Sequence, residues 1–165
     1  MFWLIAFGKG AAITVPVTPA PDKKPGEWRT YNSTISPASE SPKIEGIRWG
    51  SPVIINLSGK GEDPASATLT GRGEDLKGFS NITVYIKGNG NVKFNLYYTY
   101  DGKYMMLSRD ITASESWQEI VFNLSEGLEF GLGMPNRPDV IMPYKLVISS
   151  EGNAVINFGG AYIRR

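Results

Sequence analysis

Between residues 75 and 163, apolar and polar residues alternate with a period of two, and short glycine-containing sequences interrupt the alternation. In the segment 82–87 isoleucine and valine occupy every second position, and the segment 92–100 repeats the pattern with valine, phenylalanine, leucine and tyrosine. Successive side chains of a β-strand point to opposite faces, so this pattern is typical of strands with one buried face. The sequence therefore predicts antiparallel strands over this part of the chain.

Two turn sequences set the expected boundaries of these strands. Gly88-Asn89-Gly90 follows the first strand, and Asp101-Gly102 follows the second. Asn-Gly and Asp-Gly pairs favour the tight turns of β-hairpins, because these residues tolerate a positive φ. We therefore expect an all-β, antiparallel β-sandwich with minimal helix. The expected strands are 53–57, 65–70, 82–87, 92–100, 103–111, 117–125, 144–150 and 154–163.

The order of these pieces resembles the carbohydrate-binding-module branch of the galactose-binding-like jelly rolls. The resemblance rests on the segment 75–79 (Asp-Leu-Lys-Gly-Phe), on Trp117-Gln118-Glu119 at the start of a strand, and on the final Tyr162-Ile163. It implies a jelly-roll sandwich in which one sheet face contacts sugars and Trp117 is a buried aromatic residue. Such modules often hold a structural calcium, but Gly159-Gly160 stand here in place of the acidic ligand. We therefore expect no metal site.

The chain contains no histidine and no cysteine. Their absence excludes disulfide bonds, zinc–thiolate sites, thiol nucleophiles and the Ser-His or Cys-His pairs of many hydrolases. No pair of carboxylates stands at a recognisable catalytic spacing either, so we expect a non-catalytic protein without a cofactor. A formal net charge of +1, with no basic stripe, argues against nucleic acid as a partner.

The outward side of the two central strands offers a candidate sugar-binding face. Alternation places Tyr85 and Lys87 on the outside of the first strand and Asn95 and Tyr97 on the outside of the second, and Arg109 is expected beside them. Aromatic rings can stack on the apolar faces of sugars, while amide and cationic groups bond to the hydroxyls. We therefore predict that these five residues bind carbohydrate. The alternative is an ordinary solvated sheet face whose tyrosines reflect strand propensity.

The N-terminal segment differs in character from the rest of the chain. Residues 2–7 are all apolar, which suggests a secretory signal peptide, but the segment has no positively charged n-region and no clear cleavage site. It is also too short to span a bilayer. A proline-rich stretch, 16–26, follows and predicts an extended linker. We therefore divide the chain into an apolar arm with its linker, 1–26, and a β-sandwich domain, 27–165.

An apolar arm left exposed is an aggregation hazard, so we expect it to be buried against another molecule. The residues expected to make this contact are Phe2, Trp3, Leu4, Ile5 and Phe7. The alternative is that the arm folds back as an edge strand of its own sandwich.

Two functions remain open from the sequence. The arm favours a structural subunit of a virion, of the tail, decoration or head-fibre type, or of an extracellular filament. Such a subunit would assemble with copies of itself or with another structural subunit. The alternative is a carbohydrate-binding module, free-standing or appended, whose partner is a polysaccharide. Both place the protein outside the cell or on a virion surface, without membrane insertion.

Overall fold

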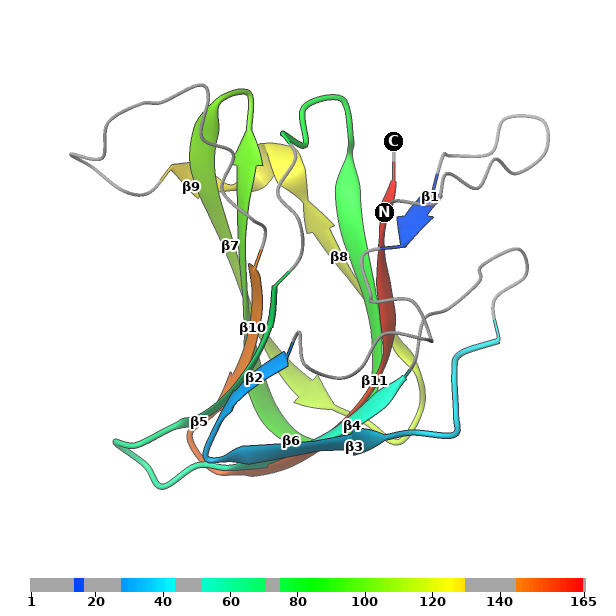
Figure 1. Cartoon of the computed structure of the whole chain (residues 1–165), viewed down its shortest axis with the longest axis vertical. Helices are drawn as coiled ribbons and strands as arrows, with labels where there is room; N and C mark the ends of the chain where they lie inside the picture. Colours follow the sequence, from blue (N-terminus) through cyan, green and yellow to red (C-terminus); the bar gives the residue numbers. More distant parts are fainter. Residues whose placement is uncertain (1–13, 17–27, 44–51, 71–74, 130–144, 165) are drawn as a thin grey trace.

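The computed structural model describes residues 14–16, 28–43, 52–70, 75–129 and 145–164 (Figure 1). Almost all of its regular structure is β-strand, and the helical element within these ranges is the short 3-10 turn η2. The elements are β1 (Thr14–Pro16), β2 (Trp28–Tyr31), β3 (Ser33–Pro37), β4 (Val53–Ser58), β5 (Ala65–Thr70), β6 (Asn81–Tyr100), β7 (Lys103–Ala113), β8 (Gln118–Asn123), η2 (Leu124–Glu126), β9 (Leu128–Glu129), β10 (Lys145–Ser150) and β11 (Asn153–Arg164).

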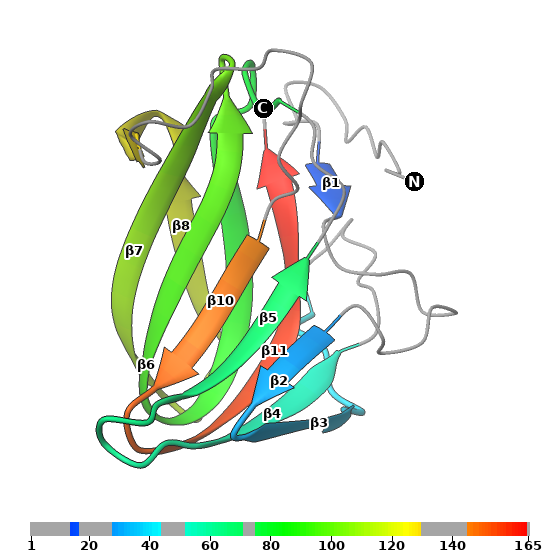
Figure 2. The same cartoon turned by 60° about the vertical axis from the view of Figure 1, so that its left-hand side comes forward.

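The strands form two antiparallel layers that face each other across the core. One layer, here called the β7 sheet, has the order β2-β5-β10-β6-β7-β9. Its strands lie side by side in Figure 2. The other layer, here called the β8 sheet, has the order β8-β6-β11-β4-β3, and β1 pairs with the last residues of β11. The predicted all-β antiparallel sandwich is confirmed.

The strand β6 belongs to both sheets. Its first half, 81–89, pairs with β8 and β11, and its second half, 90–100, pairs with β7 and β10. The predicted hairpin turn at Gly88-Asn89-Gly90 is therefore wrong, because the chain continues there as one strand that passes from one layer to the other (Figure 1). Because of this crossing, the side chains of residues 90–100 belong to the β7 sheet and not to the β8 sheet.

Two glycines make the crossing possible. Gly88 and Gly90 have φ values of 149° and 104°, which side chains rarely adopt. A Cβ atom on Gly88 would lie 2.0 Å from the Val155 carbonyl oxygen, and one on Gly90 would lie 2.8 Å from Ala154 Cα. The glycines therefore serve close packing of β6 on β11 rather than a tight turn.

The core fills the space between the layers with the residues that alternation predicts. Ile82, Val84 and Ile86 point inward from the first half of β6, and Phe94 and Tyr98 are fully buried in the second half. The Tyr98 hydroxyl donates a hydrogen bond to the Leu124 carbonyl (2.6 Å), and burial raises the pKa of Tyr98 to about 12. The tyrosine therefore remains a protonated donor that ties the start of η2 to the core.

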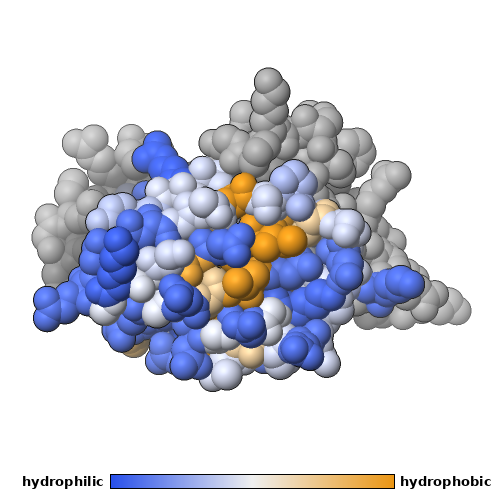
Figure 3. Space-filling view, turned by 90° about the horizontal axis from the view of Figure 1, so that it is seen from below, coloured by the Kyte–Doolittle hydropathy of each residue, from blue (hydrophilic) through white to orange (hydrophobic). Residues whose placement is uncertain are grey.

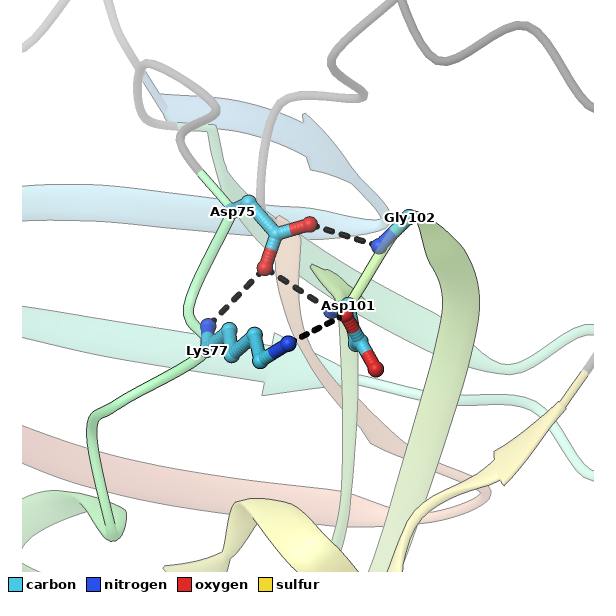
Figure 4. A network of polar contacts seen from close by, with 4 residues as sticks. All are labelled: Asp75, Lys77, Asp101 and Gly102. Atoms are coloured by element: carbon cyan, nitrogen blue, oxygen red, sulfur yellow. Dashed lines mark hydrogen bonds and ion pairs between the residues drawn. The ribbon is translucent and has the colours of Figure 1, made fainter.

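The second predicted turn is confirmed and is held by a carboxylate (Figure 4). Asp101 and Gly102 both have positive φ and join β6 to β7, as expected for an Asp-Gly hairpin. Asp75 accepts hydrogen bonds from the backbone N–H groups of Asp101 (2.8 Å), Gly102 (2.7 Å) and Lys77 (2.9 Å). Partial burial raises the pKa of Asp75, but these three bonds outweigh it, and the net pKa lies below the ordinary value.

We expect Asp75→Ala to lower the free energy of unfolding by about 1–2 kcal/mol at neutral pH, since the carboxylate is partly exposed to screening. The lowered pKa means that the ionised group stabilises the fold above the unfolded-state pKa. This stabilisation is lost as the pH falls through the folded-state pKa. Urea unfolding near pH 7 and at a pH below the lowered folded-state pKa of Asp75 measures the difference. Lys77→Ala, which removes the surface ion pair with Asp101 and keeps the backbone N–H group that donates to Asp75, is the control. A difference between parent and Asp75→Ala that persists at the lower pH would contradict this role.

The predicted strand boundaries agree with the structure to within a few residues. All eight predicted strands are present, although the segments 82–87 and 92–100 are parts of one strand. The edge strands β2 and β3, where prolines and short runs weaken the pattern, were missed. Within the described ranges, no helix is long and apolar enough to span a membrane.

Most of the predicted arm and linker lies outside the described residues. This includes Phe2 to Phe7 and the linker beyond residue 16. The exception is β1, which pairs in antiparallel register with β11 of the same chain, Val15 opposite Ile163.

Candidate functional site

The five predicted site residues do not share one face. Because β6 crosses between the layers, Tyr85 and Lys87 lie on the outer side of the β8 sheet, whereas Asn95 and Tyr97 lie on the outer side of the β7 sheet. These are opposite surfaces of the sandwich. The prediction of a common face was wrong because it treated 82–87 and 92–100 as neighbouring strands of a hairpin.

On the β8 sheet, the two predicted residues are engaged by the protein itself. Tyr85 is only 7% exposed, and its hydroxyl donates to Glu119 Oε2 (2.9 Å). Lys87 forms an ion pair with Glu40, and its ammonium lies 5.1 Å from the ring centre of Trp117. A buried tyrosine and a lysine held on both sides are poorly placed to stack on a sugar.

Arg109 points to the inner side of the β7 sheet, contrary to the prediction. It is the cross-strand partner of the buried Phe94, and residues opposite each other point to the same face. Its guanidinium donates to the Val121 carbonyl (2.8 Å) and lies 6.0 Å from the ring centre of Phe122. Arg109 therefore bridges β7 and β8 at the edge of the core.

Trp117 does not lie in the core between the sheets, so this expectation was also wrong. It is half-buried on the outside of the β8 sheet, beside Lys87. A Cβ atom on Gly159 would lie 2.8 Å from the Trp117 ring and 2.5 Å from Pro42 Cδ. The indole therefore packs over a glycine at the β-bulge of β11.

The outer side of the β7 sheet, here called the β7 face, carries the remaining two predicted residues. Tyr97 and Asn95 are half-buried, and exposed Lys93 continues their row along β6. The Ser108 hydroxyl donates to Asn95 Oδ1, so Nδ2 of the same amide is the atom available to a ligand. On β7 the face continues with Tyr104, the partner of Thr99.

Cross-strand registers extend this face over five strands. The residues that share a row with Lys93 are Tyr31, Ser66, Ser149 and Asp110. The residues that share a row with Asn95 are Arg29, Thr68, Val147 and Ser108. Hydroxyls, an amide and charges of both signs thus occupy the centre of the face, and tyrosines stand near its two sides.

Tyr31 is the aromatic residue of this face that the sequence did not reveal. It lies on the edge strand β2, is 55% exposed, and stands three strands from Lys93, about 14 Å away. Its hydroxyl donates to Asp63 Oδ1 (2.8 Å), and the Asn32 amide donates to Asp63 Oδ2 (3.1 Å). The bond to Asp63 raises the pKa of Tyr31 and lowers that of Asp63. Alternation from Trp28, which packs on buried Phe158, could have placed Tyr31 outward.

A hollow of about 670 Å³ opens at the foot of the β7 face. Lys93, Asp110, Ser149 and Asn91 line it together with the turn at Glu151. The Thr112 hydroxyl donates to Asn91 Oδ1 (2.9 Å), which leaves the Asn91 Nδ2 to donate to a ligand. Within the described parts of the chain, no group of three acidic side chains is placed to hold a metal ion.

Several solved structures that superpose on this chain are carbohydrate-binding modules. The family 11 module from Clostridium thermocellum, in complex with a β-1,3-1,4-mixed-linked tetrasaccharide, superposes with a TM-score of 0.58 at 15% identity, covering 88% of this chain and 92% of the other. A mutant of a family 29 module, complexed with cellulohexaose, gives a TM-score of 0.53 at 12% identity, covering 94% and 93%. The chain has the jelly-roll β-sandwich fold of these modules. In sequence it matches no protein-family model and no curated protein.

Within this jelly-roll fold, the segment 75–79 that carried the resemblance has a definite structural task. Asp75 clamps the hairpin at Asp101, and Leu76 is 2% exposed, with its N–H donating to the Thr99 carbonyl (2.9 Å). Gly78 has a φ of 91°, which lets the chain turn toward β6. The segment 75–79 therefore stabilises the fold, and its residues give no indication of a ligand.

Proposed function

We propose that the protein binds a polysaccharide, without catalysis, through the β7 face. The observation that carries the proposal is the joint display of Tyr97, Asn95, Lys93 and Tyr31 on the outer side of one sheet. A sheet face of this kind suits a chain of sugars, because tyrosine rings can cover the apolar faces of the sugars while amides, hydroxyls and charges bond to their edges. The fold shared with carbohydrate-binding modules supports the same reading by analogy.

The prediction of Asn95 and Tyr97 as contacts is kept in this proposal, and Tyr31 is added. Tyr85 and Lys87 are left out because they lie on the opposite sheet, and Arg109 is left out because it points to the inner side of the β7 sheet. The protein acts outside the cell in this proposal, where polysaccharides are accessible.

Affinity gel electrophoresis of the parent protein tests this function. We expect its migration to be retarded in gels that contain one or more polysaccharides from a panel of neutral glucans, mannans, xylans and galactans and of acidic uronans. Serum albumin run in the same gels controls for sieving by the polymer. Unretarded migration with every member of the panel would contradict the proposal.

The other function considered, a virion or filament subunit assembled through the apolar arm, stays a prediction. Residues 2–7 lie outside the described residues, and β1 pairs within its own chain. Removal of residues 1–13, with sedimentation analysis before and after, would test self-association: loss of an oligomer favours the arm as its cause.

A further inference from the structure

A second, smaller hollow lies on the other side of the β6 crossing. It has a volume of about 330 Å³ and opens on the outer side of the β8 sheet. Its lining includes Ile54, Val155, Asn89, Asn157 and Lys87. Seen from below, where β3, β4 and the bend of β6 lie, the molecule presents a small apolar patch surrounded by hydrophilic residues (Figures 1 and 3). The β7 face does not include this hollow.

Two aliphatic side chains give this hollow an apolar side. Val155 is 43% exposed and stands between Asn89 and Asn56 in the register of the sheet. Ile54 is the partner of Asn157, two positions along β11 from Val155, so both point outward. An exposed valine next to a half-buried isoleucine offers apolar surface that can contact the C–H groups of a sugar ring.

Polar groups surround this apolar side. Asn157 stands opposite Lys87, and its Oδ1 is buried without a hydrogen-bond partner among the groups described. Burying an unpaired amide oxygen is costly, and a ligand hydroxyl that donated to it would remove this cost. Lys87 is fixed by Glu40 and Trp117, and Glu115 also lines the hollow. Hydrogen-bond donors and acceptors therefore flank Ile54 and Val155. A ligand with many hydroxyl groups requires both.

The two hollows lie close together at the foot of the sandwich. Gly90, Asn91 and Asn153 line the larger one, whereas Gly88, Asn89 and Val155 line the smaller one. Along both β6 and β11 these residues are only two positions apart, a distance of about 7 Å. A single extended ligand can therefore reach both hollows by passing over the exposed Asn89 and Asn91.

We propose that the smaller hollow is a second carbohydrate subsite, which takes a further sugar residue of the same chain that occupies the β7 face. This inference rests on the proposed function and adds the path of the ligand around the crossing of β6. Long oligosaccharides then bind more tightly than short ones, because only long ones fill both hollows.

Isothermal titration calorimetry tests the path with a disaccharide and a hexasaccharide from the polysaccharide that retards the parent. We expect Val155→Asp to weaken hexasaccharide binding about tenfold and to leave disaccharide binding unchanged. Asn89→Ala should act in the same direction with less risk to the strand. Val155→Thr, which keeps the shape of the side chain, is the matched control, and thermal unfolding verifies that each variant is folded.

The outcomes separate this inference from the proposed function. Equal affinity of the parent for both fragments, or hexasaccharide affinities unchanged by Val155→Asp and Asn89→Ala, would overturn the second subsite and leave binding at the β7 face intact. A parent protein that sediments as a dimer, and becomes a monomer with Val155→Asp, would overturn it in favour of a contact between copies. Retardation by no polysaccharide removes the proposed function itself and the subsite with it.

Discussion

Gly88→Ala is expected to lower the free energy of unfolding by about 3–5 kcal/mol, or to prevent folding altogether. The new Cβ atom would stand 2.0 Å from the Val155 carbonyl oxygen, and the residue has a φ of 149°. Neither the close contact nor the unfavourable φ can be relieved by a local shift, because Gly88 pairs with Ile156 and its N–H donates to the Ser114 carbonyl (2.7 Å). The crossing of β6 joins both sheets, so its distortion weakens the whole sandwich.

Urea unfolding followed by circular dichroism measures this loss. The matched control is Gly152→Ala in the nearby turn between β10 and β11, where a Cβ atom meets nothing within 4 Å. The control should unfold within about 0.5 kcal/mol of the parent, as surface substitutions usually do. If Gly88→Ala behaves like Gly152→Ala, the crossing does not depend on a glycine at this position.

Tyr97→Ala is expected to weaken polysaccharide binding by about tenfold to a hundredfold, or about 1.4–2.8 kcal/mol. Tyr97 lies on β6 within the β7 face, opposite Lys145 and two positions from Asn95. Its ring is the largest flat surface that β6 offers to a ligand on this side. The protein should remain folded, because the side chain lies outside the core.

Affinity electrophoresis with the polysaccharide that retards the parent measures the effect. Tyr97→Phe keeps the ring and loses only the hydroxyl, so it should retain most of the affinity if stacking dominates. Tyr85→Phe on the opposite sheet should bind like the parent. Full retardation of Tyr97→Ala would mean that the ligand does not contact this part of the face.

The course of β6 separates what the sequence could predict from what it could not. Alternation alone correctly assigns Ile82, Val84, Phe94 and Leu96 to the core, because burial of one face imposes a period of two wherever a strand lies. The same alternation cannot tell which sheet a strand joins. Gly88-Asn89-Gly90 carries the composition of a hairpin turn, and the need for glycine there comes from the approach of Val155, which is far away along the chain.

The residues of the candidate site differ in how well the sequence could place them. Asn95 and Tyr97 were correctly placed together because they are on one strand. Arg109 could have been placed from the predicted Asp101-Gly102 turn, which pairs Tyr100 with Lys103 and therefore Phe94 with Arg109. Trp117 required knowledge of the bulge at Gly159, which leaves room for an indole outside the sheet. Tyr31 was missed because β2 is an edge strand of four residues, too short for a clear pattern.

The binding of a carbohydrate by the β7 face is tested most directly by mapping where a ligand changes the protein. Backbone amide chemical shifts recorded by NMR during titration with a hexasaccharide of the retarding polysaccharide give this map. The account predicts that the largest changes occur at Lys93, Asn95, Tyr97 and Ser149 and at Tyr31 on the edge of the sheet. Largest changes in β3 and β8, with the residues of the β7 face unaffected, would contradict it.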